Sequence, residues 1–288
     1  MTNTEGASRP VLAVLGAGTM GRGIAQVAAL AGYDVRLTDV SDEALESAMG
    51  RVKAQLDKGV ELGKVEPDVR DAALGRLRAT SDAAEAMAGA EIVVEAVPEV
   101  LELKQEILAG AAETVEANTL LATNTSSLSI TAIAEAVPGQ ERVVGMHFFN
   151  PVHIMALVEI VRGDRTAPDA VERAREAAER MGKTPIVVVD SPGFASSRLG
   201  IALGLEAIRM FEAGVASAED IDRAMELGYR HPMGPLRLTD LVGLDVRLEI
   251  ARHLHRELGD RFQPPELLGQ MVEEGKLGKK SGRGFYVW

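Results

Sequence analysis

The 288-residue sequence contains no cysteine and only five histidines. The absence of thiols excludes disulfides, thiolate metal sites and cysteine nucleophiles at once. It is compatible with a reducing compartment. Because the histidines are few, each can be weighed separately as an acid, a base or a metal ligand.

Positive charge is also scarce. Lysine and arginine together number 31 against 43 acidic residues, which gives a formal net charge of −12 and a pI near 5.0. Such a field repels polyanions, so we expect no nucleic acid as partner. A phosphorylated ligand would have to be held locally, by backbone amides or by a few placed cations.

Long apolar runs are the third absence. No window approaches the roughly 20 apolar residues of a membrane-spanning helix. The first ten residues, MTNTEGASRP, contain no apolar segment of signal-peptide length. The composition, 46% hydrophobic and 26% charged, is typical of a folded globular protein. We therefore expect a soluble, cytoplasmic protein with no membrane partner.

In the first two thirds of the chain, short β-branched runs alternate with Ala-rich stretches at helical spacing. The expected strands are residues 11–16, 33–40, 90–97, 117–126, 142–149, 157–164 and 183–190. This α/β alternation is typical of a Rossmann-type, doubly wound and mostly parallel sheet. Residues 41–79 contain no strand candidate and indicate an inserted pair of helices, broken near "EPD" (66–68).

The pattern changes at "SPGF" (191–194), where a turn is expected. From there the spacing is helical, and the one strand candidate is the terminal "GFYVW" (284–288). We therefore expect an α/β domain over residues 1–189 and an all-α domain over residues 190–288.

The first expected strand leads into "GAGTMG", which has the order G-x-G-x-x-G. The candidate cofactor-binding residues of this motif are Gly16, Gly18, Thr19, Met20 and Gly21. Gly16 would allow a tight turn, Gly18 the approach of a pyrophosphate, and Gly21 close packing of helix on sheet. Asp39 ends the second expected strand, where its carboxylate can bind the adenosine ribose and repel a 2′-phosphate. The motif predicts NAD rather than NADP; the alternative is a glycine-rich turn without a ligand.

His147 lies near the end of the fifth expected strand, in "RVVGMHFFNPV" (142–152). A dinucleotide without cysteine or a metal cluster indicates hydride transfer, for which the protein must supply an acid or a base. The carboxyl end of this strand lies at the edge where open α/β sheets bind ligands.

Glu159 stands in the apolar run "ALVEIV", where a carboxylate needs a partner. The "NPV" turn between the two strands could bring it beside His147. A carboxylate on one ring nitrogen would fix the tautomer, so that the other nitrogen could take a proton from a substrate hydroxyl. The alternatives are a packed or surface histidine and an edge-strand acid that faces solvent.

The remaining histidines are weaker candidates. His253 and His255 are two apart on an expected helix, which excludes an i, i+4 metal pair. His231 precedes a proline in a loop, and His153 follows the Asn-Pro turn. We expect no metal site.

Seven motifs together resemble the short-chain L-3-hydroxyacyl-CoA dehydrogenases, which include the bacterial 3-hydroxybutyryl-CoA dehydrogenases. They are GAGTMGRGIA, VVEAVPE, TNTSSLSI, GMHFFNPV, LVEIV, DSPGF and KKSGRGFY, and they cover essentially the whole chain in the family's order. The resemblance implies an NAD-binding N-terminal domain and a helical C-terminal domain that forms most of a homodimer interface. It also implies reversible oxidation of a 3-hydroxyacyl thioester.

The resemblance further implies roles for individual residues. His147 would be the general base and Glu159 its orienting partner. Ser126 and Asn150 would lie around the nicotinamide and the reacting end of the substrate. Three more residues match positions that contact NAD: Glu99, Lys104 and Lys280.

Some positions depart from the family pattern. Ser197 stands where the family usually has an asparagine close to the thioester, Ala156 where lysine is common, and His153 where a second proline is usual. Tyr229 and Arg230 replace small residues. The basic residue that meets coenzyme A in some members has no evident match; the candidates nearby are Lys53, Lys58 and Lys64.

Because these departures surround the acyl group and its carrier, alternatives stay open. The leading hypothesis is an NAD-dependent dehydrogenase of a short-chain 3-hydroxyacyl-CoA such as 3-hydroxybutyryl-CoA. A related enzyme could act on an acyl-carrier-protein thioester or a free sugar acid. A third possibility is a non-catalytic NAD-binding protein. Neutral drift would also explain the departures.

Overall fold

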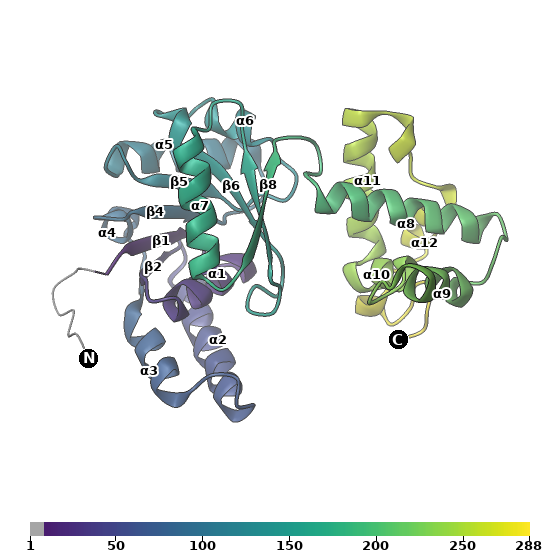
Figure 1. Cartoon of the computed structure of the whole chain (residues 1–288), viewed down its shortest axis with the longest axis horizontal. Helices are drawn as coiled ribbons and strands as arrows, with labels where there is room; N and C mark the ends of the chain where they lie inside the picture. Colours follow the sequence, from purple (N-terminus) through teal and green to yellow (C-terminus); the bar gives the residue numbers. More distant parts are fainter. Residues whose placement is uncertain (1–8) are drawn as a thin grey trace. The chain divides into compact units, whose positions relative to one another are not determined.

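The structure is a computed structural model that describes residues 9–288. The polar N-terminal stretch, on which the expectation of no secretion signal rests, lies almost wholly outside this range. The chain divides after Asp190 into two compact units, each with its own hydrophobic core (Figure 1). In the part of the chain that the structure describes, no helix is both long and apolar enough to cross a membrane.

The first unit is built on one eight-stranded sheet with the order β3-β2-β1-β4-β5-β6-β7-β8. The strands are β1 (Val11–Leu15), β2 (Asp34–Thr38), β3 (Leu77–Thr80), β4 (Ile92–Glu95), β5 (Leu120–Thr123), β6 (Val143–Phe148), β7 (Leu157–Arg162) and β8 (Thr184–Val189). The strands β1 to β6 are parallel, whereas β7 is antiparallel to β6 and parallel to β8. The predicted Rossmann-type, mostly parallel sheet is confirmed.

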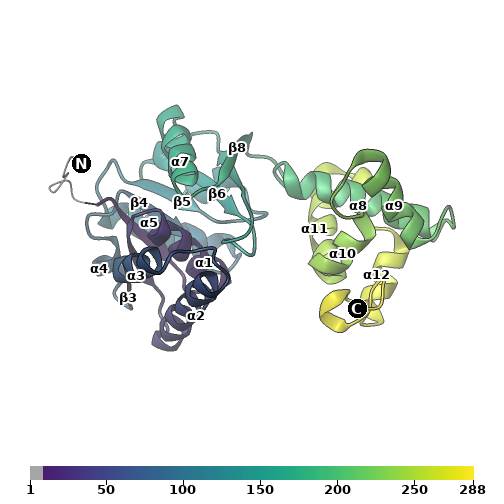
Figure 2. The same cartoon turned by 60° about the horizontal axis from the view of Figure 1, so that its bottom comes forward.

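Helices cover both faces of this sheet. They are α1 (Thr19–Leu30), α2 (Asp42–Glu61), α3 (Pro67–Arg76), α4 (Ala83–Met87), α5 (Leu101–Thr114), α6 (Ile130–Ala134) and α7 (Pro168–Arg180), with a short 3₁₀ turn at Gln140–Arg142. The helices α1 and α7 pack on one face, and α4, α5 and α6 contact the other. The predicted inserted pair is α2 and α3. They extend from the first unit in Figure 1, and both contact α1, which lies beside α2 in Figure 2.

The prediction that residues 41–79 contain no strand was wrong, because β3 begins at Leu77. Only Leu77 of this four-residue strand is buried, while Arg78 and Ala79 are exposed. The sequence therefore shows neither an apolar run nor a clear alternation. The strand forms because its backbone pairs with β2, with Leu77 opposite Val35, and such pairing depends on tertiary context more than on local propensity.

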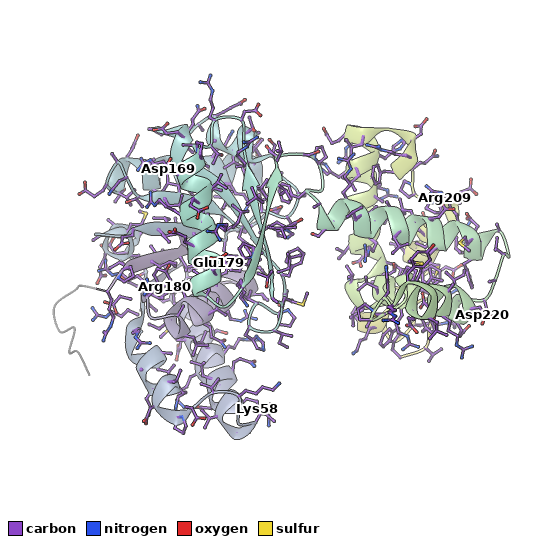
Figure 3. The ribbon with its side chains drawn as sticks, viewed as in Figure 1. Lys58, Asp169, Glu179, Arg180, Arg209 and Asp220 are labelled. Carbon is purple, nitrogen blue, oxygen red and sulfur yellow. The ribbon has the colours of Figure 1, made fainter. Side chains whose placement is uncertain are left out.

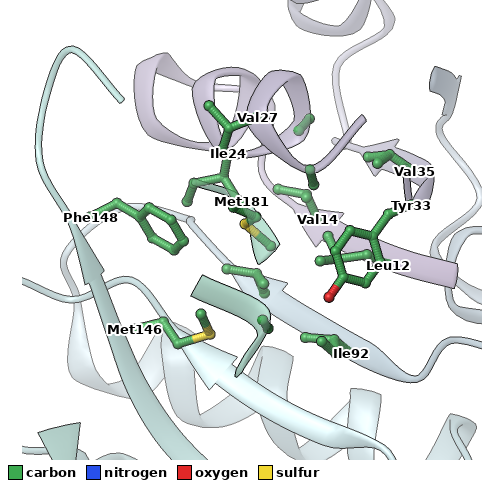
Figure 4. Close-up of a cluster of buried hydrophobic side chains, with 14 of the residues drawn as sticks. Leu12, Val14, Ile24, Val27, Tyr33, Val35, Ile92, Met146, Phe148 and Met181 are labelled. Carbon is green, nitrogen blue, oxygen red and sulfur yellow. The ribbon is translucent and has the colours of Figure 1, made fainter. Parts of the chain in front are cut away.

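The core of the first unit fills the layer between the sheet and α1 and α7. Leu12 of β1, Ile24 of α1 and Met146 and Phe148 of β6 all lie in this cluster (Figure 4). Successive side chains of a strand point to opposite faces. Because Met146 and Phe148 point into this core, His147 between them must point to the other face.

The second unit is helical. It contains α8 (Ser196–Glu212), α9 (Ala218–Tyr229), α10 (Pro235–Val242), α11 (Leu244–Leu258) and α12 (Glu266–Glu273), with 3₁₀ turns at Asp260–Phe262 and Lys279–Ser281. The predicted terminal strand "GFYVW" is wrong, because the end of the chain makes only isolated bridges through Arg283. The backbone N–H groups of Phe285 and Tyr286 instead donate to the carboxylate of Asp240, so side-chain acceptors replace a strand partner.

Candidate active site

The glycine motif forms the turn between β1 and α1. Gly16 has a φ of +104°, and a Cβ atom there would lie 2.7 Å from the carbonyl oxygen of Ala96. A Cβ at Gly21 would lie 1.8 Å from the carbonyl oxygen of Gly16. These two positions therefore admit only glycine. At Gly18, by contrast, a Cβ would meet nothing within 4 Å, so there is open space at the start of α1.

A cavity of about 1,070 Å³ opens at this turn, between the motif, the end of β2 and the face of α5. Asp39 lines it, and its carboxylate holds the turn: Oδ2 accepts the N–H of Ala17 at 2.8 Å and Oδ1 accepts the N–H of Ser41 at 3.1 Å. A carboxylate can accept about four hydrogen bonds, so capacity for ribose hydroxyls remains. A pyrophosphate would meet the amino end of α1, where the helix dipole favours an anion. The cavity and its lining fit a dinucleotide such as NAD.

His147 and Glu159 lie directly opposite each other in the antiparallel register of β6 and β7. Their side chains therefore share one face of the sheet, and Nδ1 of His147 lies 2.8 Å from Oε2 of Glu159. Glu159 is fully buried and His147 is 6% exposed. The ring of Phe149 packs against the imidazole, with 4.4 Å between the centroids. The contact expected from "NPV" is present and places a carboxylate-oriented imidazole at the carboxyl end of β6.

Glu99 organises the loop that carries Ser126. Its Oε1 accepts the hydroxyl of Thr125 at 2.6 Å and the backbone N–H groups of Ser126 and Ser127 at 2.8 and 3.1 Å. Burial alone would raise the pKa of Glu99, but these hydrogen bonds and the charge of Lys104 together hold that pKa below its ordinary value. The carboxylate therefore stays ionised and fixes the exposed Ser126 in place.

Lys104 is fully buried beside a second carboxylate, that of Glu95 at the end of β4. Its Nζ lies 2.8 Å from Oε1 of Glu95 and 3.4 Å from Oε2 of Glu99. The other oxygen of Glu95 accepts the hydroxyl of Thr123 at 2.5 Å. Sequence reasoning missed Glu95, although an acid in the apolar run "EIVVEAV" was a signal of the same kind as Glu159. The pair ties β4, α5 and β5 together beneath the Glu99 loop.

The remaining predicted residues fall in both units. Asn150 lies exposed in the turn after β6, whose end is held by the side-chain carbonyl of Asn124, which accepts the N–H of Phe148 at 2.9 Å. Ser197 lies in the first turn of α8 in the second unit. Lys280 also belongs to the second unit, where its Nζ binds Oδ2 of Asp245 at 2.5 Å. The first unit thus brings together the glycine motif, Asp39, the His147–Glu159 pair and the Ser126 loop.

The comparison with protein families matches both units of the chain. Residues 11–191 match the model for the "3-hydroxyacyl-CoA dehydrogenase, NAD binding domain", and residues 193–288 match that for the "3-hydroxyacyl-CoA dehydrogenase, C-terminal domain". The chain belongs to the 3-hydroxyacyl-CoA dehydrogenase family. It is an NAD-dependent oxidoreductase, as the sequence motifs implied.

Relatives of this dehydrogenase align over nearly its whole length. A probable 3-hydroxybutyryl-CoA dehydrogenase of Bacillus subtilis is 46% identical over 274 residues, which are 95% of each chain. A 3-hydroxyadipyl-CoA dehydrogenase of Escherichia coli is 44% identical and aligns with 96% of this chain and 58% of its own. The solved structure of (S)-3-hydroxybutyryl-CoA dehydrogenase PaaH1 from Ralstonia eutropha superimposes with a TM-score of 0.93 at 39% identity, covering 98% and 99% of the two chains.

Two of the basic residues considered for coenzyme A are paired with acids on α2. Nζ of Lys53 lies 2.6 Å from Asp57, and Nζ of Lys58, which is labelled in Figure 3, lies 2.9 Å from Glu61. His153, one of the departures from the family pattern, bonds Nε2 of Gln55 across 2.9 Å. Arg230 ends α9 in the left-handed conformation, with a φ of +59°.

Proposed function

We propose that this dehydrogenase reversibly oxidises a short-chain L-3-hydroxyacyl-CoA, such as 3-hydroxybutyryl-CoA, to the 3-oxoacyl thioester. The observation that carries the proposal is the buried His147–Glu159 pair at the carboxyl edge of the sheet that also forms the dinucleotide cavity. The names of the relatives from Bacillus subtilis and Ralstonia eutropha support the same acyl group.

In this mechanism His147 is the general base. Glu159 binds Nδ1 of His147, so Nε2 is the ring nitrogen that takes the proton of the substrate's 3-hydroxyl group. The glycine motif and Asp39 would hold NAD, which would supply the acceptor for the hydride that leaves C3, the carbon that bears this hydroxyl. The imidazolium that forms is stabilised by Glu159, which is fully buried and therefore acts through a medium of low dielectric. In the reverse direction the imidazolium returns the proton to the 3-oxo group.

Further residues would bind and orient the reactants. Ser126 and Asn150 would lie around the nicotinamide and the reacting end of the substrate, and Ser197 near the thioester. Glu99 would position Ser126 through the hydrogen bonds of its loop. Lys104 is fully buried, so we assign it a positioning role through Glu99 rather than a direct contact with NAD. Lys280 as an NAD contact, the homodimer and the cytoplasmic location stay predictions from the sequence.

The test is NADH-linked reduction of acetoacetyl-CoA by the purified protein, with acetoacetyl-acyl-carrier protein assayed alongside. We expect turnover of the CoA ester. Turnover of the carrier-protein ester alone would contradict the proposal and make Ser197 and Ala156 candidates for carrier selection. If the protein reduced no 3-oxoacyl thioester, the proposal that it acts on thioesters would be contradicted.

The role of His147 is tested with His147→Gln, which retains hydrogen-bonding capacity toward Glu159. We expect kcat to fall by about 10²–10⁴-fold, because loss of a general base typically has this effect. NAD affinity, measured by fluorescence titration, should change little. The control is His253→Ala in α11, a position outside the proposed mechanism. If NAD affinity fell as steeply as kcat, His147 would have a structural rather than a catalytic role.

A further inference from the structure

The end of β6 that carries His147 is held differently on its two sides. On one side, β7 pairs with β6 as far as Phe148, which lies opposite Val158. On the other side, the register between β5 and β6 ends with Thr123 opposite Gly145. The strand β5 therefore stops before it reaches His147. Another group must satisfy the backbone of β6 there, because an N–H group shielded from water needs an acceptor.

Asn124 supplies this acceptor. It directly follows β5, and its side-chain oxygen Oδ1 accepts the N–H of Phe148 at 2.9 Å. The bond takes the place of the next backbone hydrogen bond of the β5–β6 ladder. The ring of Phe148 is buried in the core on the face opposite to His147 (Figure 4). The residue after His147 is thus held both at its N–H and at its ring, which restricts the backbone of His147.

Asn124 is itself firmly placed. Its backbone N–H donates to the carbonyl oxygen of Glu95 at 2.8 Å. The preceding residue, Thr123, is fully buried and donates its hydroxyl to the carboxylate of Glu95 at 2.5 Å. The following residue, Thr125, is also fully buried and donates its hydroxyl to Glu99 at 2.6 Å. A side chain fixed on both flanks can determine the position of the strand end that it binds.

The proposed reaction makes the position of the imidazole critical. Nδ1 of His147 lies 2.8 Å from Oε2 of Glu159, and Nε2 must at the same time reach the substrate hydroxyl. Both distances depend on the backbone of His147, because few bonds rotate between it and the ring. A misplacement of about 1 Å near the reacting groups can lower the rate by about 10²-fold.

We propose that Asn124 is a positioning residue for the reaction. By accepting the N–H of Phe148, it sets the backbone from which His147 presents its imidazole to the substrate hydroxyl. This inference rests on the proposed function, because it takes His147 as the general base. In this role Asn124 acts through His147. Its loss should therefore slow proton transfer without weakening the binding of NADH.

Three variants separate positioning from stability. Asn124→Ala removes the acceptor, whereas Asn124→Asp keeps an acceptor oxygen on a side chain of the same length. The control is Thr166→Val at the amino end of the same strand, where the buried hydroxyl of Thr166 donates to the carbonyl oxygen of Val143 at 2.6 Å. This control also removes a side-chain bond to the backbone of β6, but at the end away from His147. Urea unfolding compares the stability of the variants.

With NADH and acetoacetyl-CoA, Asn124→Ala should lower kcat roughly tenfold to a hundredfold and change the KM for NADH by less than about twofold. The solvent deuterium isotope effect on kcat should rise, because proton transfer becomes slower relative to hydride transfer. Asn124→Asp should recover most of the lost kcat, and Thr166→Val should not lower it. Equal losses of kcat in Asn124→Ala and either of the other two variants would overturn the proposal.

A double-variant cycle tests whether the effect passes through the base. In the His147→Gln background, Asn124→Ala should have little further effect on kcat, because the group that Asn124 positions is already absent. If the two losses instead multiplied, Asn124 would act independently of His147 and the proposal would be wrong.

Nuclear magnetic resonance of protein that contains isotopically labelled histidine gives a readout without turnover. The chain has five histidines, so the ring signals of His147 are those that disappear in His147→Gln. In Asn124→Ala the signal of the Nδ1 proton between His147 and Glu159 should shift, and this proton should exchange faster with water. In Thr166→Val both properties should match the native protein.

The two kinds of measurement separate this inference from the proposed function. If the native protein reduces no thioester, but Asn124→Ala alone changes the His147 signal, the function fails and the positioning role stands. If His147→Gln lowers kcat as expected, while Asn124→Ala matches Thr166→Val in kcat and in the His147 signal, the positioning role fails and the function stands. Absence of turnover together with an unchanged signal would overturn both.

Discussion

At the scale of single residues, the site depends on carboxylates that are held by backbone and side-chain donors. Glu159 orients the imidazole of His147, Glu99 fixes the loop of Ser126, and Asp39 joins the glycine turn to the end of β2. The three carboxylates differ in burial: Glu159 is fully buried, Asp39 is half-buried and Glu99 is exposed. Substitutions of the three should therefore differ in their effect on activity, because Asp39 alone among them lines the dinucleotide cavity.

Asp39→Ala should raise the KM for NAD by roughly tenfold to a hundredfold, since a charged acceptor of ribose hydroxyls is lost. It should also reduce the preference for NAD over NADP, because the carboxylate no longer repels a 2′-phosphate. Both effects are measured as kcat/KM with the two cofactors. Asp39→Asn serves as the comparison, because it removes the charge but keeps one acceptor oxygen. An unchanged cofactor preference in both variants would show that Asp39 does not face the ribose.

At the scale of elements, the buried Lys104–Glu95 pair connects β4, α5 and β5. Both side chains have no exposed surface, and Thr123 of β5 completes the network. Breaking a buried ion pair from one side leaves an uncompensated charge, whereas removing both charges does not. Variants of this network therefore test whether the buried pair stabilises the sheet and, through Lys104, the Glu99 loop.

Glu95→Gln should lower the free energy of unfolding by about 3–5 kcal/mol, because Lys104 would keep a buried charge with a weaker partner. The double variant Glu95→Gln, Lys104→Met should regain much of that loss. Urea unfolding followed by circular dichroism measures both. Additive losses in the double variant would contradict a direct coupling between the two side chains. Because Lys104 also lies 3.4 Å from Glu99, the double variant should still show a raised KM for substrate.

At the scale of the whole molecule, the chain is two units with separate cores. The end of the chain belongs to the second unit, where the buried Asp240 accepts the N–H groups of Phe285 and Tyr286 and the indole N–H of Trp288. The hydroxyl of Tyr286 also donates to Asp222 at 2.7 Å. Burial and this carboxylate raise the pKa of Tyr286, so the hydroxyl remains a donor even at alkaline pH.

Asp240→Ala should destabilise the second unit by about 2–4 kcal/mol, because three part-buried donors lose one shared acceptor that is itself buried. NAD affinity should change little, since the glycine motif and Asp39 lie in the first unit. Differential scanning calorimetry with and without NAD measures both effects. The substitution should lower the unfolding temperature of the second unit, and NAD should raise the unfolding temperature of the first unit only. A single transition that falls as a whole would show that the two units unfold together.

The sequence by itself determined those features whose physical cause is local. Gly16 and Gly21 were recognisable because their positions admit no side chain, and β1, β4 and β6 because buried parallel strands are apolar runs. His147 and Glu159 were found because a polar residue inside such a run needs a partner. The Rossmann-type sheet followed from the alternation of strand-like and helical stretches in the first two thirds of the chain, and the helical second unit from the change of periodicity near Asp190.

The tertiary structure alone decided the features that depend on residues far apart in the chain. β3 is a strand because β2 offers it a partner, and "GFYVW" is not a strand because Asp240 takes its backbone donors. Arg22 of α1, Arg51 of α2 and His153 of the turn after β6 line one cavity. Twenty-nine residues separate the first two along the sequence, and about one hundred separate the last two. Local sequence patterns indicate which side chains must be buried or paired, but only long-range packing determines which of them contact one another.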